Sequence, residues 1–254
     1  MFVSVVIPTY NRRPILEKCL SALEDQQLSG ALQDYEVVVV DDGSTDGTSG
    51  LLSRRSDILL ETHPVNQGYG AALITAFRFA VQQRYDILVT IDCDGQHEPQ
   101  RIPEFVKACQ RTDVDVVSGS RYLQQFAGDS EPPEQRMKIN RKITGLLNER
   151  LGLNLTDTFC GFKAYSVPAL ARMNLTEPGY AMPLELWVQT VCLELNVIEI
   201  PVPLIYLDEK RSFGGNLDDG QQRLKYYLEI INRSLRALPQ DCRHFSSIEL
   251  TPCE

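Results

Sequence analysis

The sequence predicts a single α/β domain in which a mostly parallel β-sheet is covered by helices on both faces. Short apolar runs alternate along the chain with stretches whose apolar residues recur every three to four positions. The runs are almost uninterrupted, which is typical of strands that are buried on both faces of a parallel sheet. The chain has 254 residues, of which 43% are hydrophobic, so it is long enough to bury one large core.

The first half of the chain shows this alternation most regularly. Strands are predicted at residues 3–7, 37–40, 58–60, 87–91 and 114–117. One helix is predicted from Pro14, whose fixed φ suits a first helical position, and two more from Gly68 and over residues 99–110. This order of strands and helices favours a parallel sheet with helical crossovers.

The second half of the chain is less regular. Helices are predicted at residues 135–151, 182–195 and 219–238, and two short strands at 197–200 and 204–206. Residues 128–133 are polar and read as a loop. The segment from Pro239 to the end shows no such periodicity, so we expect a loosely held tail there.

Charge and cysteine content limit the possible partners and location. The net charge is −9, from 34 acidic and 25 basic residues, so the protein as a whole repels nucleic acid and anionic lipid. No apolar run reaches eighteen residues and no signal peptide is recognisable, so we expect a soluble, cytoplasmic protein without a transmembrane segment. The seven cysteines are odd in number and lack C-x-x-C spacing, which favours reduced thiols.

Three of the predicted strands end in polar clusters. These clusters are Pro8-Thr9-Tyr10-Asn11, Asp41-Asp42-Gly43-Ser44 and Asp92-Cys93-Asp94-Gly95-Gln96. The carboxyl ends of the strands in such sheets are where ligands bind, so the clusters are expected to meet in one cleft. Asp92 and Asp94 have the spacing that lets two carboxylates share a hard cation such as Mg²⁺ or Mn²⁺, with Gln96 as a further oxygen ligand.

Each cluster taken singly also has an ordinary structural explanation. Asp92 and Asp94 suit an acidic turn before a helix, and Asp41 with Asp42 suits an Asx turn followed by a helix cap. Tyr10 offers an aromatic face to a nucleobase, but the segment around it equally suits a plain turn. The case for a site therefore depends on the combination.

The order of the motifs resembles the family 2 inverting glycosyltransferases, which have the GT-A fold. P-T-Y-N, D-D-G-S, N-x-G-x-G at Asn66-Gln67-Gly68-Tyr69-Gly70 and D-x-D-x-Q-H follow one another as in that family, although a lysine is common where Tyr69 stands. Gly119-Ser120-Arg121-Tyr122 and residues 157–165, DTFCGFKAY, are similar to the polyprenyl-phosphate mannose and glucose synthases, such as dolichyl-phosphate mannose synthase.

This resemblance implies a metal-dependent hexosyltransferase that uses GDP-mannose or UDP-glucose. The implied domain spans residues 1–238, with nucleotide-sugar binding in about 1–118 and acceptor binding in about 119–238, followed by the tail 239–254. The implied residues are as follows: Asp92, Asp94 and Gln96 for the metal; Pro8, Thr9, Tyr10, Asn11, Asp41, Asp42, Gly68 and Asp92 for the nucleotide sugar; Arg121, Arg141 and Lys163 for the acceptor phosphate; Asp94, Arg211 and Asp157 for catalysis. The chain departs from the family pattern at Arg12 and after Gly215.

The nature of the acceptor decides whether a general base is needed. A phosphate monoester is already largely ionised at neutral pH, so it needs cations to hold it rather than a base. Lys138, Arg141 and Lys142 lie on one face of the predicted helix 135–151 and suit a polyprenyl phosphate at the inner membrane surface, although the same pattern fits a solvated face. Two alternatives stay open: a sugar hydroxyl acceptor with Asp157 as its base, and a nucleotide-sugar-binding protein without turnover.

Overall fold

The computed structural model describes residues 1–28, 35–207, 215–242, 245 and 247–251. Seven strands form one sheet in the order β3-β2-β1-β4-β6-β5-β7. Their bounds are β1 (Val3–Thr9), β2 (Tyr35–Asp41), β3 (Ile58–Thr62), β4 (Ile87–Thr90), β5 (Val116–Ser120), β6 (Lys163–Ser166) and β7 (Val197–Pro201). All pairs are parallel except those of β6, which runs antiparallel between β4 and β5. The predicted fold class is confirmed.

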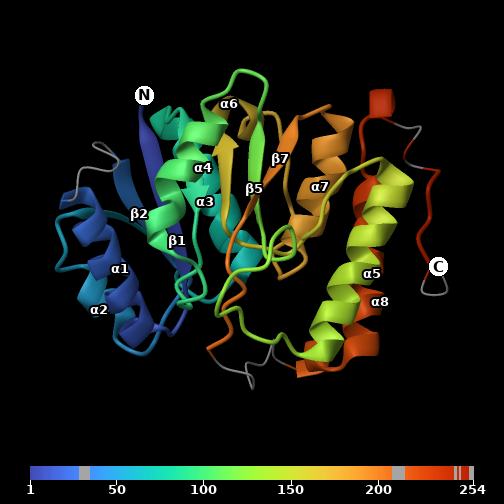
Figure 1. Ribbon diagram of the computed structural model, residues 1–254. Helices are drawn as coiled ribbons and strands as arrows, with labels where there is room; N and C mark the ends of the chain where they lie inside the picture. The colour runs from blue at the N-terminus through green and yellow to red at the C-terminus, as the bar shows by residue number, and fades with distance from the viewer. Residues whose placement is uncertain (29–34, 208–214, 243–244, 246, 252–254) are drawn as a thin grey trace.

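The helices cover both faces of this sheet (Figure 1). Their bounds are α1 (Arg13–Leu28), α2 (Thr48–Leu52), α3 (Tyr69–Gln83), α4 (Ile102–Cys109), α5 (Glu134–Leu151), α6 (Val167–Leu170), α7 (Met182–Cys192) and α8 (Gly220–Arg236), with 3₁₀ turns at Pro99–Arg101, Gly215–Asp218 and Gln240–Cys242. Among the described residues, no helix is long and apolar enough to cross a membrane.

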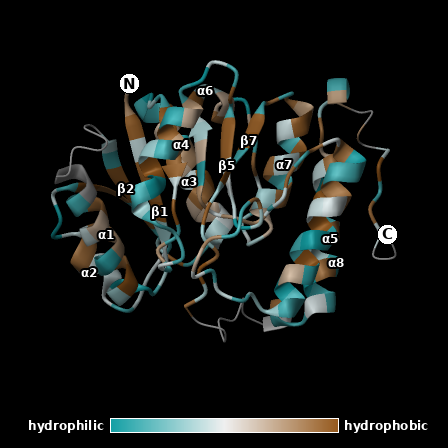
Figure 2. Cartoon of the chain, viewed as in Figure 1, coloured by the Kyte–Doolittle hydropathy of each residue, from teal (hydrophilic) through white to brown (hydrophobic). Residues whose placement is uncertain are grey.

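Two hydrophobic cores lie on opposite faces of the sheet. In β2, Val38 and Val40 belong to the core under α3, α5, α7 and α8, whereas Val37 and Val39 belong to the core under α1, α2 and α4. All four side chains are at most 5% exposed. Burial on both faces explains why this strand is apolar at every position rather than at alternate ones, and Figure 2 shows the central strands as hydrophobic along their length.

The structure differs from the sequence predictions of local structure in two places. The antiparallel strand β6 was not predicted, because its four residues follow a loop and carry no periodic signal. Residues 204–206 do not form a strand. Two backbone N–H groups there donate to side chains instead of to a neighbouring strand: Leu204 N donates to Asp129 Oδ1 at 2.9 Å, and Tyr206 N donates to Ser130 Oγ at 3.0 Å.

The described part of the C-terminal segment is packed against the domain rather than loosely held. Leu250 is 2% exposed, and its backbone exchanges two hydrogen bonds of 2.8 and 2.9 Å with the side-chain amide of Asn232 on α8. A disulfide joins Cys192, the last residue of α7, to Cys242 just beyond α8. The prediction of uniformly reduced thiols is therefore wrong for this pair, because the fold brings together two cysteines that are 50 residues apart in sequence.

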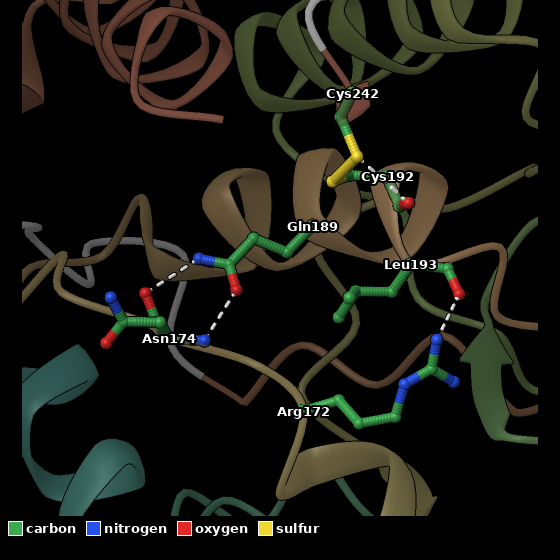
Figure 3. The surroundings of a disulfide bond; sticks show 6 residues. All are labelled: Arg172, Asn174, Gln189, Cys192, Leu193 and Cys242. Carbon is green, nitrogen blue, oxygen red and sulfur yellow. Dashed lines mark hydrogen bonds between the residues drawn. A yellow bond between two sulfur atoms is a disulfide. The ribbon is translucent and has the colours of Figure 1, made fainter. Parts of the chain in front are cut away.

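The end of α7 that carries Cys192 is fixed by further hydrogen bonds (Figure 3). Arg172 Nη2 donates to Leu193 O at 2.8 Å, and the Gln189 amide bonds both backbone groups of Asn174 at 2.7 and 2.8 Å. The disulfide thus joins the C-terminal segment to an ordered part of the domain.

Reducing this disulfide is expected to lower the free energy of unfolding by about 4 kcal/mol, because the open chain regains the entropy of a loop of 50 residues in the unfolded state. Urea unfolding with and without a phosphine reductant measures the difference. A Cys192→Ser/Cys242→Ser double variant is the control, since its stability should not respond to reductant. Equal stability of the parent protein in both conditions would contradict a stabilising role.

Candidate active site

The loops after β1 and β2 are tied together at the carboxyl edge of the sheet, which is the lower edge in Figure 1. Asn11 N donates to Ser44 Oγ at 2.9 Å, and Thr45 N donates to Asn11 Oδ1 at 2.7 Å. Asn11 adopts a left-handed backbone with φ of 49°, which asparagine tolerates better than most residues. Asn11, predicted to contact the nucleotide, does not line the adjacent cavity and instead joins the two loops.

A cavity of about 340 Å³, called here the Tyr10 cavity, lies beside these loops. Its lining residues are Pro8, Thr9, Tyr10, Arg12, Asp42, Asn66, Gly68, Tyr69, Ala72, Asp92, Cys93, Asp94, Gly179 and Tyr180. Most of the residues predicted for the nucleotide sugar therefore face one space. The polar clusters after three strands do meet in a single cleft.

The two neighbouring aspartates after β2 have different positions. Asp42 lines the Tyr10 cavity and accepts hydrogen bonds from Gln67 N and Gly68 N, both at 2.8 Å, so it holds the N-x-G-x-G segment. Its Oδ1 also lies 2.6 Å from His63 Nδ1. Asp41 is fully buried and accepts from Ser44 N at 3.0 Å and from Ser49 Oγ. Asp41 is absent from the cavity lining, because these bonds keep its carboxylate in the turn.

Asp92 and Asp94 stand where the Tyr10 cavity meets a second one. Tyr69 Oη donates to Asp92 Oδ1 at 2.9 Å, and Gln96 N donates to Asp94 Oδ1 at 3.0 Å. Burial raises the pKa of Tyr69 well above its ordinary value, and the Asp92 charge raises it further, so the phenol stays a donor. A side chain at Gly161 would lie 2.3 Å from Asp92 Oδ2, so only glycine leaves room for this carboxylate.

The donor set of Asp92, Asp94 and Gln96 fits a hard divalent cation. Two carboxylates and an amide oxygen are ligands of the kind that Mg²⁺ and Mn²⁺ take. No group of three His, Cys, Asp or Glu side chains able to hold a metal occurs among the described residues. An ion here would therefore complete its shell with water or with oxygens of a bound ligand.

The second cavity, called here the Arg136 cavity, has a volume of about 150 Å³. Three arginines from different parts of the fold line it: Arg121 after β5, Arg136 on α5 and Arg223 on α8. Arg223 is 3% exposed and its pKa is lowered by burial and by the charge of Arg136. Neighbouring cations that are removed from water favour an anionic ligand between them.

Asp157 is held in an ion pair instead of facing the cavity as a base. Its carboxylate receives both Nε and Nη2 of Arg121, at 2.6 and 2.9 Å, and Nδ2 of Asn140 at 2.8 Å. Burial alone would raise the pKa of Asp157, but the Arg121 charge and these hydrogen bonds lower it to about 2. A carboxylate that is fully buried and so acidic is a poor proton acceptor, which argues against the predicted base role.

Replacing Asp157 by asparagine is expected to cost about 3 kcal/mol of stability at pH 7, because buried Arg121 loses its counter-charge. The folded-state pKa lies below the unfolded one, so this contribution is present above pH 4 and is lost as pH falls towards 2. Urea unfolding from pH 7 to pH 2 should show parent and variant converging. An unchanged free energy of unfolding at pH 7 would contradict this account, and Asp113→Asn in an exposed pair is the control.

Two of the three predicted phosphate-binding cations lie elsewhere. Lys163 is 2% exposed, its Nζ donates to Cys160 O, and it lies 5.4 Å from the Trp187 ring, so it belongs to the protein interior. Arg141 is exposed on α5 and is absent from the lining of the Arg136 cavity. Of the predicted set, Arg121 alone reaches that cavity. Arg211, predicted to act on the leaving diphosphate, lies outside the described residues.

Sequence reasoning missed Arg136 and Arg223. On α5, Arg136 lies three and four residues before buried Ile139 and Asn140, and on α8, Arg223 lies four residues before buried Tyr227. Each arginine is thus in line with the apolar face of its helix. Burying a charged residue costs free energy unless a partner or ligand offsets it, so an arginine in such a position is a candidate for a functional site, and this was the available signal.

Comparisons with known proteins agree with this geometry. Residues 4–173 match the model of a family described as glycosyl transferase family 2. The undecaprenyl-phosphate mannosyltransferase of Micrococcus luteus is 32% identical, over 85% of this chain and 89% of that protein. The polyprenol monophosphomannose synthase of Mycolicibacterium smegmatis is 27% identical, over 78% and 75%.

Solved structures show the same architecture. A glucosyl-3-phosphoglycerate synthase from Mycobacterium tuberculosis, solved with Mn²⁺, UDP and phosphoglyceric acid, superposes with a TM-score of 0.64 at 21% identity. The match covers 95% of this chain and 78% of that one and shows a shared fold. With the family match and the D-x-D cleft at the carboxyl edge of the sheet, the chain belongs to glycosyl transferase family 2, with the GT-A fold.

Proposed function

We propose that this protein is an inverting hexosyltransferase that moves a hexose from a nucleotide sugar to a polyprenyl phosphate. The carrying observation is that two cavities share Asp92 and Asp94, and that arginines from three separate elements line the second cavity. A nucleoside diphosphate fits the first arrangement and a phosphate monoester fits the second. The names of the Micrococcus luteus and Mycolicibacterium smegmatis relatives support this acceptor.

A divalent cation, Mg²⁺ or Mn²⁺, is the cofactor in this proposal. Asp92, Asp94 and Gln96 would hold it, and it would neutralise the charge that develops on the departing diphosphate. Arg211 is proposed as a further cation for that leaving group. The Mn²⁺ in the Mycobacterium tuberculosis structure is consistent with a divalent cation as the cofactor.

If the acceptor is a phosphate, the side chains of the site need only bind and orient it and need not remove a proton from it. A phosphate monoester has its second pKa near 6, so its oxygen is a nucleophile at neutral pH without a general base. Arg121, Arg136 and Arg223 would hold that phosphate, and Asp157 would keep Arg121 oriented. The phosphate oxygen bonds to the anomeric carbon from the face opposite the diphosphate, the bond from that carbon to the diphosphate breaks, and the configuration inverts.

The two halves of the chain divide these tasks in our proposal. Residues 1–118 supply most of the contacts to the donor and residues 119–238 most of those to the acceptor, with Gly179 and Tyr180 of the second half also lining the Tyr10 cavity. Leu123 and Leu207 are 45% and 67% exposed, and Leu207 lies beside Gly95 of the D-x-D loop. Exposed leucines close to the site suit contact with a lipid surface, so we propose peripheral binding at the cytoplasmic face of a membrane.

A direct assay tests this function. Purified protein with Mn²⁺ is incubated with GDP-mannose or UDP-glucose and a short polyprenyl phosphate, and the product is identified by mass spectrometry. We expect a polyprenyl phosphate that carries the hexose on its phosphate group, formed from GDP-mannose in preference to UDP-glucose. Free sugars and phosphoglyceric acid serve as alternative acceptors. Transfer to a sugar hydroxyl, or donor hydrolysis without any transferred product, would contradict the proposal.

A further inference from the structure

Two stacked tyrosines stand at the junction of the two cavities. Tyr69, Asp92, Asp94 and Tyr180 are the residues common to the linings of the Tyr10 cavity and the Arg136 cavity. The Tyr69 and Tyr180 rings are nearly parallel, at 18°, with centroids 5.8 Å apart. Tyr180 is 38% exposed despite this stacking. An aromatic side chain that is partly open to a cleft, beside the metal-binding carboxylates, is suited to contact a ligand.

The turn that carries Tyr180 is fixed by two buried carboxylates. Glu177, which is 3% exposed, accepts hydrogen bonds from Gly179 N at 2.9 Å and from Tyr226 Oη at 2.6 Å, and it pairs with Arg233. Glu185, which is 5% exposed, accepts from Glu177 N at 2.7 Å. Buried charges are costly unless they are fully bonded, so their use on one short turn indicates that its position matters.

The glycines of the N-x-G-x-G segment let this turn approach α3. A side chain at Gly68 would lie 2.4 Å from Pro178 O, and one at Gly70 would lie 2.3 Å from Glu177 O. Ala71 N donates to Pro178 O at 3.1 Å, which joins the two segments directly. The close approach is what brings Tyr180 over Tyr69. Segments more than 100 positions apart in sequence are thus shaped to build one aromatic wall.

We propose that Tyr180, backed by Tyr69, is the platform against which the transferred hexose packs, an inference that rests on the proposed function. In the proposed reaction, the sugar must lie beside Asp92 and Asp94, because it is bonded to the diphosphate. Its anomeric carbon must also face an acceptor phosphate in the Arg136 cavity. A sugar at the junction of the two cavities meets both requirements. One face of a pyranose presents C–H groups, which pack favourably on the electron-rich face of an aromatic ring.

The alternative ligand for Tyr180 is the nucleobase, and binding measurements separate the two. Calorimetry with Mn²⁺ compares GDP with GDP-mannose and UDP with UDP-glucose, for the parent, Tyr180→Leu and Tyr180→Phe. We expect Tyr180→Leu to bind the nucleotide sugar about fivefold to tenfold more weakly while binding the nucleoside diphosphate as the parent does. Tyr180→Phe keeps the aromatic ring and should bind the nucleotide sugar about as tightly as the parent does. Tyr10→Leu serves as the comparison that should weaken both ligands, because Tyr10 lines the Tyr10 cavity but not the Arg136 cavity.

The binding and transfer results together decide whether Tyr180 contacts the transferred hexose. Equal losses of both ligands in Tyr180→Leu would place the base there and overturn the proposal, and unchanged binding of both would also overturn it. Transfer assays on the parent protein test the proposed function separately. A parent that transfers hexose, with a Tyr180→Leu variant whose affinities match it, would reject the platform and leave the proposed function standing. A parent that binds no nucleotide sugar would reject both.

Discussion

Replacing Asp94 by asparagine is expected to lower the rate of hexose transfer about 10³-fold, because one of the two carboxylates proposed for the metal loses its charge. The amide has nearly the same shape, and Asp94 is only partly buried, so we expect the fold to be retained. Steady-state transfer rates in saturating Mn²⁺ measure the loss, and urea unfolding measures stability.

Asp113→Asn is a matched control for this change, since Asp113 lies in an exposed pair with Arg111 before the start of β5, at the edge of the sheet opposite the cleft loops. Its activity should equal that of the parent. If Asp94→Asn transferred hexose as fast as the parent protein, Asp94 would have no part in metal binding. If it unfolded instead, the experiment would be repeated with Gln96→Ala, which removes an oxygen ligand without removing a charge.

Replacing Arg136 by glutamine is expected to reduce transfer to a polyprenyl phosphate about 10²- to 10³-fold, because a charge-assisted contact to a phosphate shielded from water is lost. Binding of the nucleotide sugar should change little, because Arg136 lines the second cavity and not the first. Transfer kinetics over a range of acceptor concentrations, together with calorimetry of donor binding, resolve the two effects.

Arg141→Gln provides the control, since Arg141 lies on the same helix but outside the cavity. Its kinetics should match those of the parent. Loss of transfer in Arg141→Gln with full activity in Arg136→Gln would show that the acceptor phosphate binds along the exposed face of α5. The assignment from the sequence pattern would then be correct and the assignment from the cavity wrong.

The strands of the first half of the chain and the position of the cleft could be predicted from the sequence because both depend on local patterns. Continuous apolar runs such as residues 37–40 reveal burial on both faces, and polar clusters directly after them mark the carboxyl edge of the sheet. β6 could not be predicted. Its four residues gain their place from pairing with β4 and β5, which is a long-range effect.

The roles of individual polar residues were harder to predict, because they depend on which partner each side chain finds. Asp157 carries the same charge as Asp94, but Arg121 and Asn140 bond to it in the interior and remove it from proton transfer. Lys163 is a cation within the family motif at residues 157–165, but its side chain is buried, with Nζ over the Trp187 ring. Sequence alone shows that a charge is present and not which way it points.

The covalent link between α7 and the segment after α8 bears on where the protein works. Glutathione keeps most cytosolic thiols reduced, so a persistent bond of this kind normally indicates folding in an oxidising compartment or shielding from exchange. Cys242 is 7% exposed, which limits attack on its sulfur by an outside thiolate, whereas Cys192 is only partly buried. The oxidation state of Cys192 and Cys242 in freshly lysed cells, read by alkylation and mass spectrometry, therefore shows whether this bond exists where the protein works, and free thiols would agree with the proposed cytoplasmic face.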